Sequence, residues 1–383
     1  MPSIFHRPEL ASQLAEQVLH SSPASASPSG VFLAAPRRTG KSTFVREDLR
    51  PALERMGASV IYVDLWADRN VDPGELLTAA IRTEMSKHDN AVKRIARSLG
   101  VSGANVGGID FSLDRIGLGR EVTLAQALAA LSDEVKRPLV IVIDEAQHAL
   151  TSQAGTDSLF ALKAARDELN SSSHYGLRLV CTGSNRDKLA MLRNSRDQAF
   201  FGAPLVNFPH LDRGYVEWFC QNVRLPAVLE PAMVWALFER AGWRPEVLGA
   251  AADTLRFEFG LVADEVPTRF ADAVDEQIGA SATEALRVIR ALTPLQSAVL
   301  RVLAAAGKAF RPFEAATLAR YREALNAAGE DSDTVVKVDV ASVQAALQAL
   351  QEKMLIWRAA RGVYDLEDGS VRDVLLGGSD AEG

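Results

Sequence analysis

The stretch AAPRRTGKST, residues 34–43, ends in Gly-Lys-Ser-Thr, the ending that a phosphate-binding loop requires. The apolar run at 31–35 before it predicts a strand, and the pattern of 40–57 after it predicts a helix that stops at Gly57. A loop between a strand and a helix turns consecutive backbone N–H groups inward, where they meet phosphate oxygens. Such loops usually open with glycine, and Ala35 stands in that position. We interpret Ala35 as a tolerated variant, because the position needs only a small residue with a negative φ.

Each residue type at the end of this loop has a chemical role. Lys41 would reach the β- and γ-phosphates, and the hydroxyl of Ser42 would bind Mg²⁺. Gly40 would let the backbone approach closely, and Thr43 can reach the α-phosphate. The residues that we expect to bind the nucleotide here are Pro36, Arg37, Arg38, Thr39, Gly40, Lys41, Ser42 and Thr43.

A second candidate element is the fully apolar run PLVIVIDE at 138–145, which predicts a buried strand ending in two acids. The carboxyl end of a parallel strand faces the same crevice as the phosphate loop. Asp144 would hold the Mg²⁺ ion with its water shell, and Glu145 would orient and polarise the attacking water. Taken alone, the two acids could instead begin a helix, where a carboxylate is favoured by the helix dipole. A phosphate loop in the same chain favours the nucleotide-site interpretation.

A third candidate element is CTGSNR at 181–186, where an apolar strand ends in polar side chains. A strand in this place can present Thr182, Ser184 or Asn185 to a γ-phosphate. The alternative is a plain polar turn without a ligand.

The rest of the first half alternates strands with helices, which predicts an α/β domain with a parallel sheet. The strands are apolar runs, so we expect helices to cover both faces of the sheet. A hairpin is expected at 101–120. Further strands are predicted at 59–66, 177–184 and 204–208, and further helices at 5–20, 72–100 and 123–137.

The second half carries no strand pattern until its end. Residues 212–283 are helical throughout and predict a separate lobe. Three further helices are expected at 292–307, 313–327 and 341–354, and two short strands follow within 355–367; together they describe a winged helix. Thr293, Pro294 and Gln296 form a capping box at the start of the first of these helices. We therefore expect three domains: 1–210 as the nucleotide-binding core, 211–283 as a helical lid, and 284–383 as a winged-helix domain.

Composition narrows the function classes. The chain has 383 residues, is 48% hydrophobic and carries a formal net charge of −7, which argues against a protein coated in nucleic acid. Two cysteines indicate buried free thiols in a reducing compartment. We found neither a signal peptide nor an apolar run near the ~20 residues of a membrane span. A cytoplasmic protein without a membrane partner is expected.

The combination of APRRTGKST with VIDEAQH and a polar strand end resembles the AAA+ and STAND branch of P-loop ATPases. It looks most like the archaeal-type ATPases related to origin-recognition proteins, whose plan of P-loop domain, helical lid and winged helix spans nearly the whole chain. The resemblance implies a strand order of 5-1-4-3-2. It also implies ATP and Mg²⁺ as cofactors, and activity tied to a protein partner or a homo-oligomer.

The resemblance also implies roles for residues outside the two core motifs. FHRPEL (5–10) resembles the segment that flanks the adenine, with Pro8 where the family has an acid, and it points to His6 and Arg7. GWRPEVL (242–248) resembles the lid sensor, which puts Arg244 and Pro245 at the nucleotide. The remaining implied residues are Arg186 near the γ-phosphate and, as arginines that could act in a neighbouring subunit, Arg193 and Arg196, which could equally be solvated surface residues.

Three functions fit these observations. The first is an ATP-hydrolysing molecular switch in which the nucleotide state sets the position of the lid and winged helix. The second is a DNA-associated ATPase helper in replication, repair or transposition. DNA is the less favoured partner, because the third helix of the winged domain offers Gln344, Gln348 and Gln351 but few of the basic residues that bind phosphates. The third is a non-catalytic scaffold, which would have no need for Glu145. GTP is disfavoured, because the chain has no Asn-Lys-x-Asp.

Overall fold

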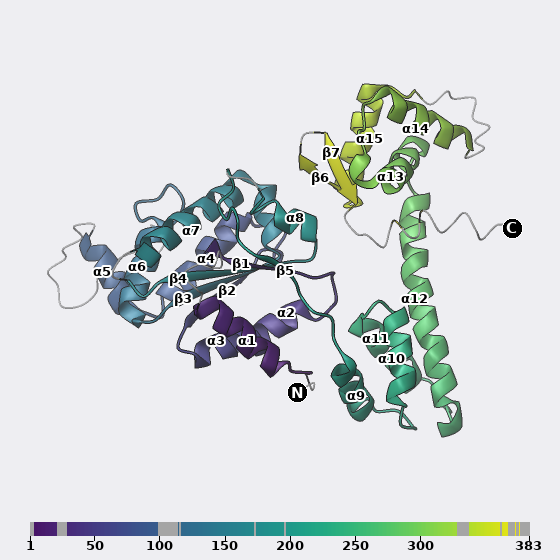
Figure 1. Cartoon of the computed structure of the whole chain (residues 1–383), viewed down its shortest axis with the longest axis horizontal. Helices are drawn as coiled ribbons and strands as arrows, with labels where there is room; N and C mark the ends of the chain where they lie inside the picture. The colour runs from purple at the N-terminus through teal and green to yellow at the C-terminus, as the bar shows by residue number, and fades with distance from the viewer. Residues whose placement is uncertain are drawn as a thin grey trace. The chain divides into compact units, whose positions relative to one another are not determined.

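The computed structural model describes residues 4–20, 29–98, 114, 116–171, 174–194, 197–327, 337–360, 362–366, 372 and 375. The chain divides into two compact units, Met1–Trp218 and Phe219–Gly383, and each is described by itself (Figure 1). Within the described ranges, no helix combines the length and the apolar character that crossing a membrane requires.

The first unit is built on a five-stranded sheet whose paired strands all run parallel. Its strands lie in the order β2-β3-β4-β1-β5, which confirms the expected order read from the other edge. The central position of β4 brings the ends of β1 and β3 to either side of it. The strand bounds are β1 Val31–Ala34, β2 Ser59–Asp64, β3 Leu139–Asp144, β4 Leu177–Gly183 and β5 Leu205–Asn207.

Alternating residues of the strands feed two separate cores, because side chains in a strand point to opposite faces in turn. Val31 and Leu33 of β1 lie in a core with helices α1 (Pro8–Leu19) and α3 (Arg50–Arg55). Phe32 and Ala34 of the same strand lie in the core on the other face. The helices of that second face are α4 Pro73–Met85, α5 Asp89–Ser98, α6 Leu124–Val135 and α7 Gln153–Ser171. Both faces are therefore covered, as the apolar runs predicted, and Figure 1 shows α1 and α3 below the sheet.

One helix prediction in this unit is corrected. The single helix expected over 72–100 is two helices, α4 and α5, separated by a turn at Ser86 and Lys87. The break lets the apolar faces of both helices, with Met85 on the first and Ile95 on the second, reach the same core. The hairpin expected at 101–120 lies largely outside the described residues; at its end, Ile116 forms an isolated bridge with Val122.

The helix after the phosphate loop contains an irregular turn. It begins as α2, Lys41–Phe44, continues as a π-helical turn, η2, over Val45–Leu49, and ends as α3. π-helical turns are rare and occur frequently at functional sites. The predicted helix over 40–57 is thus confirmed, with a local change of pitch directly behind the loop.

Short elements connect the strands at the carboxyl edge of the sheet. A 3₁₀ segment, η4 (Ala146–Thr151), follows β3, and α8 (Arg186–Ala190) follows β4. Helix α9 (Arg213–Asn222) begins in the first unit and ends in the second.

The second unit is helical up to its last two strands. Helices α10 (Pro231–Arg240), α11 (Pro245–Arg256) and α12 (Val266–Arg290) come first, and α11 packs on α12. Short 3₁₀ segments lie at η5 (Ala263–Glu265) and η6 (Gly307–Ala309). Helix α12 runs without interruption through 283/284, where the sequence suggested a domain boundary.

The end of the second unit has a core of its own. It contains α13 (Pro294–Ala306), α14 (Ala315–Ala327), α15 (Val340–Glu352) and the antiparallel pair β6 (Ile356–Ala360) and β7 (Val363–Leu366). The predicted capping box at Thr293 and Gln296 is present. Three helices followed by a two-stranded hairpin are the elements that the sequence led us to expect.

Candidate functional site

The phosphate loop lies between the end of β1 and the start of α2, at the carboxyl edge of the sheet. Gly40 has φ 81° and ψ 7°, a left-handed conformation that glycine adopts at no steric cost. Arg38 also has a positive φ, 62°, which is uncommon for a residue with a Cβ atom and is found at functional turns. The hydroxyl of Thr39 donates to the carbonyl of Pro36 (2.8 Å), and the buried Ala35 donates its N–H to Gly183 of β4 (3.1 Å). The loop is therefore held by its own residues and by the neighbouring strand.

Lys41 joins the loop to the end of β3. Its Nζ lies 2.8 Å from Oε1 of Glu145 and 3.4 Å from Oδ1 of Asp144. The side chain is only 4% exposed, so the ammonium is paired in a site that is nearly free of water. A buried charge of this kind is stable only when it is paired and hydrogen-bonded. The two motifs, separated by about 100 positions in the sequence, thus form one charged cluster.

Asp144 is held on both carboxylate oxygens. Oδ1 accepts hydrogen bonds from the hydroxyl of Thr182 on β4 and from the backbone N–H of Glu145, and Oδ2 accepts one from the hydroxyl of Tyr62 on β2 (3.1 Å). Burial raises the pKa of Asp144, but the Lys41 ammonium and hydrogen bonds from Ser42, Thr182 and Tyr62 outweigh it, so the pKa lies below its ordinary value. Asp144 is therefore an ionised, oriented carboxylate.

Glu145 has a left-handed backbone, φ 53°, which turns the chain sharply at the end of β3. Its Oε2 accepts from the side chain of Gln147 (2.5 Å) and from the hydroxyl of Ser184 (2.7 Å), while Oε1 faces Lys41. Burial raises the pKa of Glu145, but the Lys41 charge and these hydrogen bonds more than offset it, and the pKa is lowered. Positive φ at a non-glycine residue costs energy and is typical of active sites.

The polar residues after β4 fall into two groups. Thr182 and Ser184 contact the carboxylates of Asp144 and Glu145, at the centre of the cluster. Asn185 caps α8 by accepting from the N–H of Lys188 (3.0 Å), and Arg186 donates to the side chain of Asn207 (2.5 Å) on β5. The hydroxyls of Thr182 and Ser184 therefore face the acids, while Arg186 is hydrogen-bonded to β5 at the edge of the sheet.

The residues proposed to flank an adenine pack against the back of the loop helix. His6 Nδ1 lies 2.7 Å from Oδ1 of the buried Asp48, and the backbone N–H of Arg7 donates to the other oxygen (3.0 Å). The guanidinium of Arg7 lies 4.9 Å from the ring centre of Phe208 and donates to the carbonyls of 209 and 210. Burial lowers the pKa of Arg7, and nearby Asp212 partly offsets this.

The other predicted site residues make contacts of their own. Arg244 and Pro245 are at the start of α11 in the second unit, where Arg244 Nε donates to the carbonyl of Ala241 (2.9 Å). Arg193 donates to Asn194 (3.2 Å), and Arg196 lies outside the described residues.

Residue types present at the cluster suit Mg²⁺. A hydroxyl from Ser42 and an ionised carboxylate from Asp144 are hard oxygen donors, and Mg²⁺ sites commonly use one or two carboxylates together with phosphate oxygens and water. No group of three His, Cys, Asp or Glu side chains that could hold a metal occurs within the described ranges.

Comparisons with known proteins identify the fold around this cluster. Residues 26–189, which include both motifs, match the model of a family described as AAA domain. This chain resembles the AAA+ P-loop ATPases related to origin-recognition proteins. Among curated proteins no relative matches.

Solved structures agree with this AAA-like fold over nearly the whole chain. A Walker-type ATPase of Pyrococcus abyssi is 18% identical, with a TM-score of 0.53 over 97% of this chain and 96% of that one. The ORC2 protein of Aeropyrum pernix in its ADP form is 15% identical, with a TM-score of 0.56 over 100% and 96%. The same protein with ADPNP and ADP is 17% identical, with a TM-score of 0.53. At these identities the likeness concerns the fold.

The AAA-like core includes site residues that the sequence analysis did not single out. Tyr62 and Gln147 contact the two acids directly, and Arg46 donates to Tyr62. The sequence held one signal that could have identified Tyr62: Tyr62 and Asp64 are polar residues near the end of an otherwise apolar strand. Gln147 lies two residues after Glu145, where a 3₁₀ turn brings it back to the carboxylate.

An aromatic cluster borders the loop on its other side. The guanidinium of Arg37 lies 4.1 Å from the ring centre of Trp66, and the ring of His148 meets the same indole edge-on. Burial lowers the pKa of His148 to about 4, so the imidazole is neutral at pH 7. These contacts tie the tip of the loop to the segments that follow β2 and β3.

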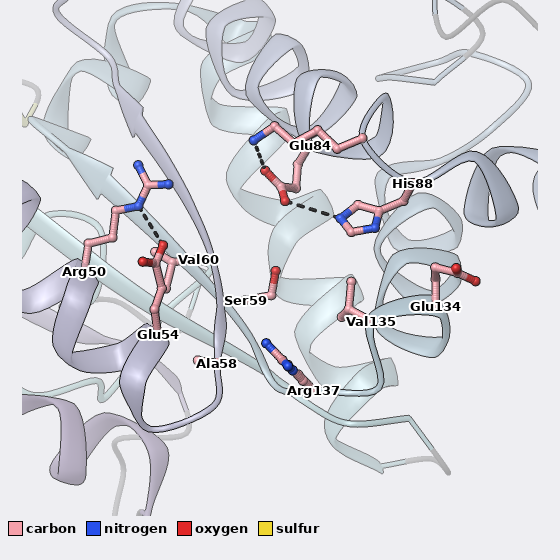
Figure 2. Close-up of a pocket in the computed structure, with 11 residues that line it drawn as sticks. Arg50, Glu54, Ala58, Ser59, Val60, Glu84, His88, Glu134, Val135 and Arg137 are labelled. Carbon is pink, nitrogen blue, oxygen red and sulfur yellow. Dashed lines mark hydrogen bonds and ion pairs between the residues drawn. The ribbon is translucent and has the colours of Figure 1, made fainter.

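A cavity of about 500 Å³ lies at the opposite edge of the sheet, where the strands begin (Figure 2). Its lining mixes both charge signs, and two of its acids are paired with nearby bases: Glu54 with Arg50 (2.9 Å), and Glu84 with Lys87 (2.7 Å). Ser59, the first residue of β2, lies between these pairs in Figure 2. This cavity is therefore separate from the candidate site at the carboxyl edge.

Proposed function

We propose that this chain is a Mg²⁺-dependent ATPase that acts as a molecular switch. The observation that carries the proposal is the contact of Lys41 with Asp144 and Glu145, which unites the phosphate loop with the two strand-end acids. Here Lys41 pairs with the two acids. When nucleotide and metal bind, Lys41 turns to the phosphates, and the metal takes its place beside the acids. The fold of the AAA-like core and its family match over 26–189 support this function.

Each residue has a role in the proposed reaction. Lys41 and the backbone of the loop bind the β- and γ-phosphates, and the charge of Lys41 stabilises the developing negative charge. Ser42 and Asp144 would hold Mg²⁺, which would neutralise negative charge on the phosphates. Glu145 orients the attacking water and accepts its proton. Ser184 and Gln147 hold Glu145 through Oε2, leaving Oε1 for the water once Lys41 turns to the phosphates.

The remaining assignments follow the family resemblance. His6 and Arg7 border the adenine, and Arg244 and Pro245 of the second unit meet the nucleotide as a lid. Arg186, Asn185 and, from a neighbouring copy, Arg196 or Arg193 complete the surroundings of the γ-phosphate. Hydrolysis then changes how the lid and the C-terminal helices bind a protein partner.

A DNA-associated ATPase is the alternative. Gln344 and Gln348 are exposed on α15, the helix that would enter a groove, and glutamine can read adenine. The C-terminal region has slightly more acidic than basic residues, which makes the phosphate contacts of such a complex sparse. We therefore rank a protein partner first.

The test is steady-state ATP turnover with and without duplex DNA. Three proteins are compared: the wild type, Glu145→Gln, and the matched control Glu168→Gln, which alters an exposed glutamate on α7. Turnover that is lost only in Glu145→Gln supports the proposal, and a rise with DNA would move the alternative to first place. Normal turnover in Glu145→Gln would refute the catalytic assignment.

A further inference from the structure

We propose that Tyr62, anchored by Arg46, is a positioning residue that orients the Asp144 carboxylate for Mg²⁺. The inference rests on the proposed function, because it assigns Asp144 to a metal site. It adds two residues, from β2 and from the loop helix, that neither the motifs nor the comparisons assign.

The contacts form a chain across three elements. Tyr62 lies on β2, which pairs with β3 in register so that Asp64 is opposite Asp144. The Tyr62 hydroxyl donates to Oδ2 of Asp144 (3.1 Å). Arg46 Nε in turn donates to the Tyr62 oxygen (2.9 Å), and Arg46 Nη2 donates to Oδ2 of Asp64 (3.3 Å).

The direction of these bonds follows from the chemistry of the groups. An arginine side chain can only donate, so the Tyr62 oxygen must accept from Arg46. The phenol has one proton, and the acceptor that lies within reach of it is the carboxylate of Asp144. A phenol has an ordinary pKa of ~10, so it keeps that proton at neutral pH. Arg46 therefore fixes Tyr62 as a donor toward Asp144.

A fixed donor on Oδ2 sets the rotation of the carboxylate. Oδ1 is held by Thr182 and by the backbone N–H of Glu145, and Tyr62 holds the second oxygen. A carboxylate restrained on both oxygens presents its remaining lone pairs in fixed directions. Partners of this kind orient metal ligands, and their loss typically weakens metal binding by roughly 10- to 100-fold.

The helix that follows the phosphate loop carries both Arg46 and Ser42, the other proposed metal ligand. Ser42 and Arg46 are four residues apart, so they lie on the same side of the helix one turn from each other. The π-helical turn begins at Val45, between them. One short helical segment thus carries both the Ser42 hydroxyl and Arg46, which orients the Tyr62 hydroxyl. A shift of this helix would therefore change the metal site in two ways, directly through Ser42 and through Arg46, Tyr62 and Asp144.

The experiment measures metal affinity separately from nucleotide affinity. Mn²⁺ binding to the nucleotide complex is followed by electron paramagnetic resonance, and nucleotide binding is measured in EDTA with a fluorescent ADP analogue. Tyr62→Phe removes only the hydroxyl. The matched control is Tyr321→Phe, a buried tyrosine of the second unit whose hydroxyl donates to the carbonyl of Pro312.

We expect Tyr62→Phe to raise the Kd for Mn²⁺ by roughly 10- to 100-fold while nucleotide affinity in EDTA stays within about twofold. Tyr321→Phe should leave the Kd for Mn²⁺ unchanged. Arg46→Met, at a half-exposed position, should weaken Mn²⁺ binding in the same direction by a smaller factor, and it serves as the test should Tyr62→Phe fail to fold.

The outcomes separate this inference from the proposed function. A wild-type protein that binds neither nucleotide nor Mn²⁺ would refute the proposed function itself. Wild-type Mn²⁺ binding together with an unchanged Kd in Tyr62→Phe and Arg46→Met would overturn the positioning role alone. An equal loss of nucleotide affinity in EDTA would also overturn it, because that result indicates a general structural role.

Discussion

Replacement of Lys41 by alanine tests the central cluster through stability, without any nucleotide. The substitution leaves the carboxylates of Asp144 and Glu145, which are 1% and 14% exposed, beside each other without their cation. Unit charges 2.8 Å and 3.4 Å apart attract by roughly 6 and 5 kcal/mol at an effective dielectric constant of ~20. Desolvation of all three groups offsets much of this. Removal of one partner from a buried ion pair typically costs ~3–5 kcal/mol, and we expect Lys41→Ala to lie in that range at pH 7.

The pH dependence of this loss has a definite sign. In the wild type the pKa values of Asp144 and Glu145 are lowered, so these acids stabilise the fold above their unfolded pKa values, and the stabilisation is lost as the pH falls. Without Lys41, burial dominates and raises both pKa values, so the acids become destabilising at neutral pH and are relieved by protonation. The difference between wild type and Lys41→Ala should therefore be largest near pH 7 and should shrink below about pH 5.

Chemical denaturation at pH 7 and pH 4.5 measures this difference. The matched control is Lys87→Ala, because Lys87 pairs with Glu84 at 2.7 Å but is 57% exposed. An ion pair whose lysine is exposed to solvent contributes ~0.2–1 kcal/mol, so the control should lose far less stability than Lys41→Ala at both pH values. A loss below ~1 kcal/mol for Lys41→Ala, or an equal loss at both pH values, would refute the buried-cluster argument.

Four further results are expected. Glu145→Gln should bind nucleotide normally and lose about 10²–10⁴-fold in turnover, measured by phosphate release; turnover near wild type would contradict its role as a base. Gly183→Ala would place a Cβ 2.5 Å from Oε1 of Gln147, so this variant should slow turnover more than it weakens binding. Arg7→Ala should cost ~1–3 kcal/mol in denaturation, because Arg7 loses two carbonyl bonds and its ring contact. In the wild type the free energy of unfolding should fall as the pH drops from 6.5 to about 4, because His148 takes up a proton there only in the unfolded chain. In His148→Phe this part of the decrease should disappear, which denaturation across that pH range measures.

Much of the fold was predictable because its signals are local. The apolar runs located the strands, and their lack of alternation implied helices on both faces, which the two cores on either side of β1 confirm. The strand order came from the family resemblance and not from spacing, because register and order depend on contacts between distant segments. The break after Met85 was missed, since no glycine or proline marks it and both sides continue the helical pattern.

The sequence predicted those site residues that belong to a local motif. It did not predict those that reach the site only through the packing of distant segments. Lys41, Asp144 and Glu145 lie together as their motifs suggested. The contact of Tyr62 with Asp144 depends on the register of β2 against β3, which no local pattern specifies. The contact of Gln147 with Glu145 depends on the tight 3₁₀ turn that follows β3.

The order of strands also has a consequence for the chain during its synthesis. The strand before the phosphate loop, β1, pairs only with β4 and β5 among the strands of its sheet, and both are made much later. Until residues 177–183 leave the ribosome, β1 has no neighbour in the sheet, and an unpaired apolar strand is prone to wrong associations. The nascent protein must therefore carry its phosphate loop in an unfinished state while β2 and β3 are made, and it becomes competent for ligand only when β4 inserts between β3 and β1.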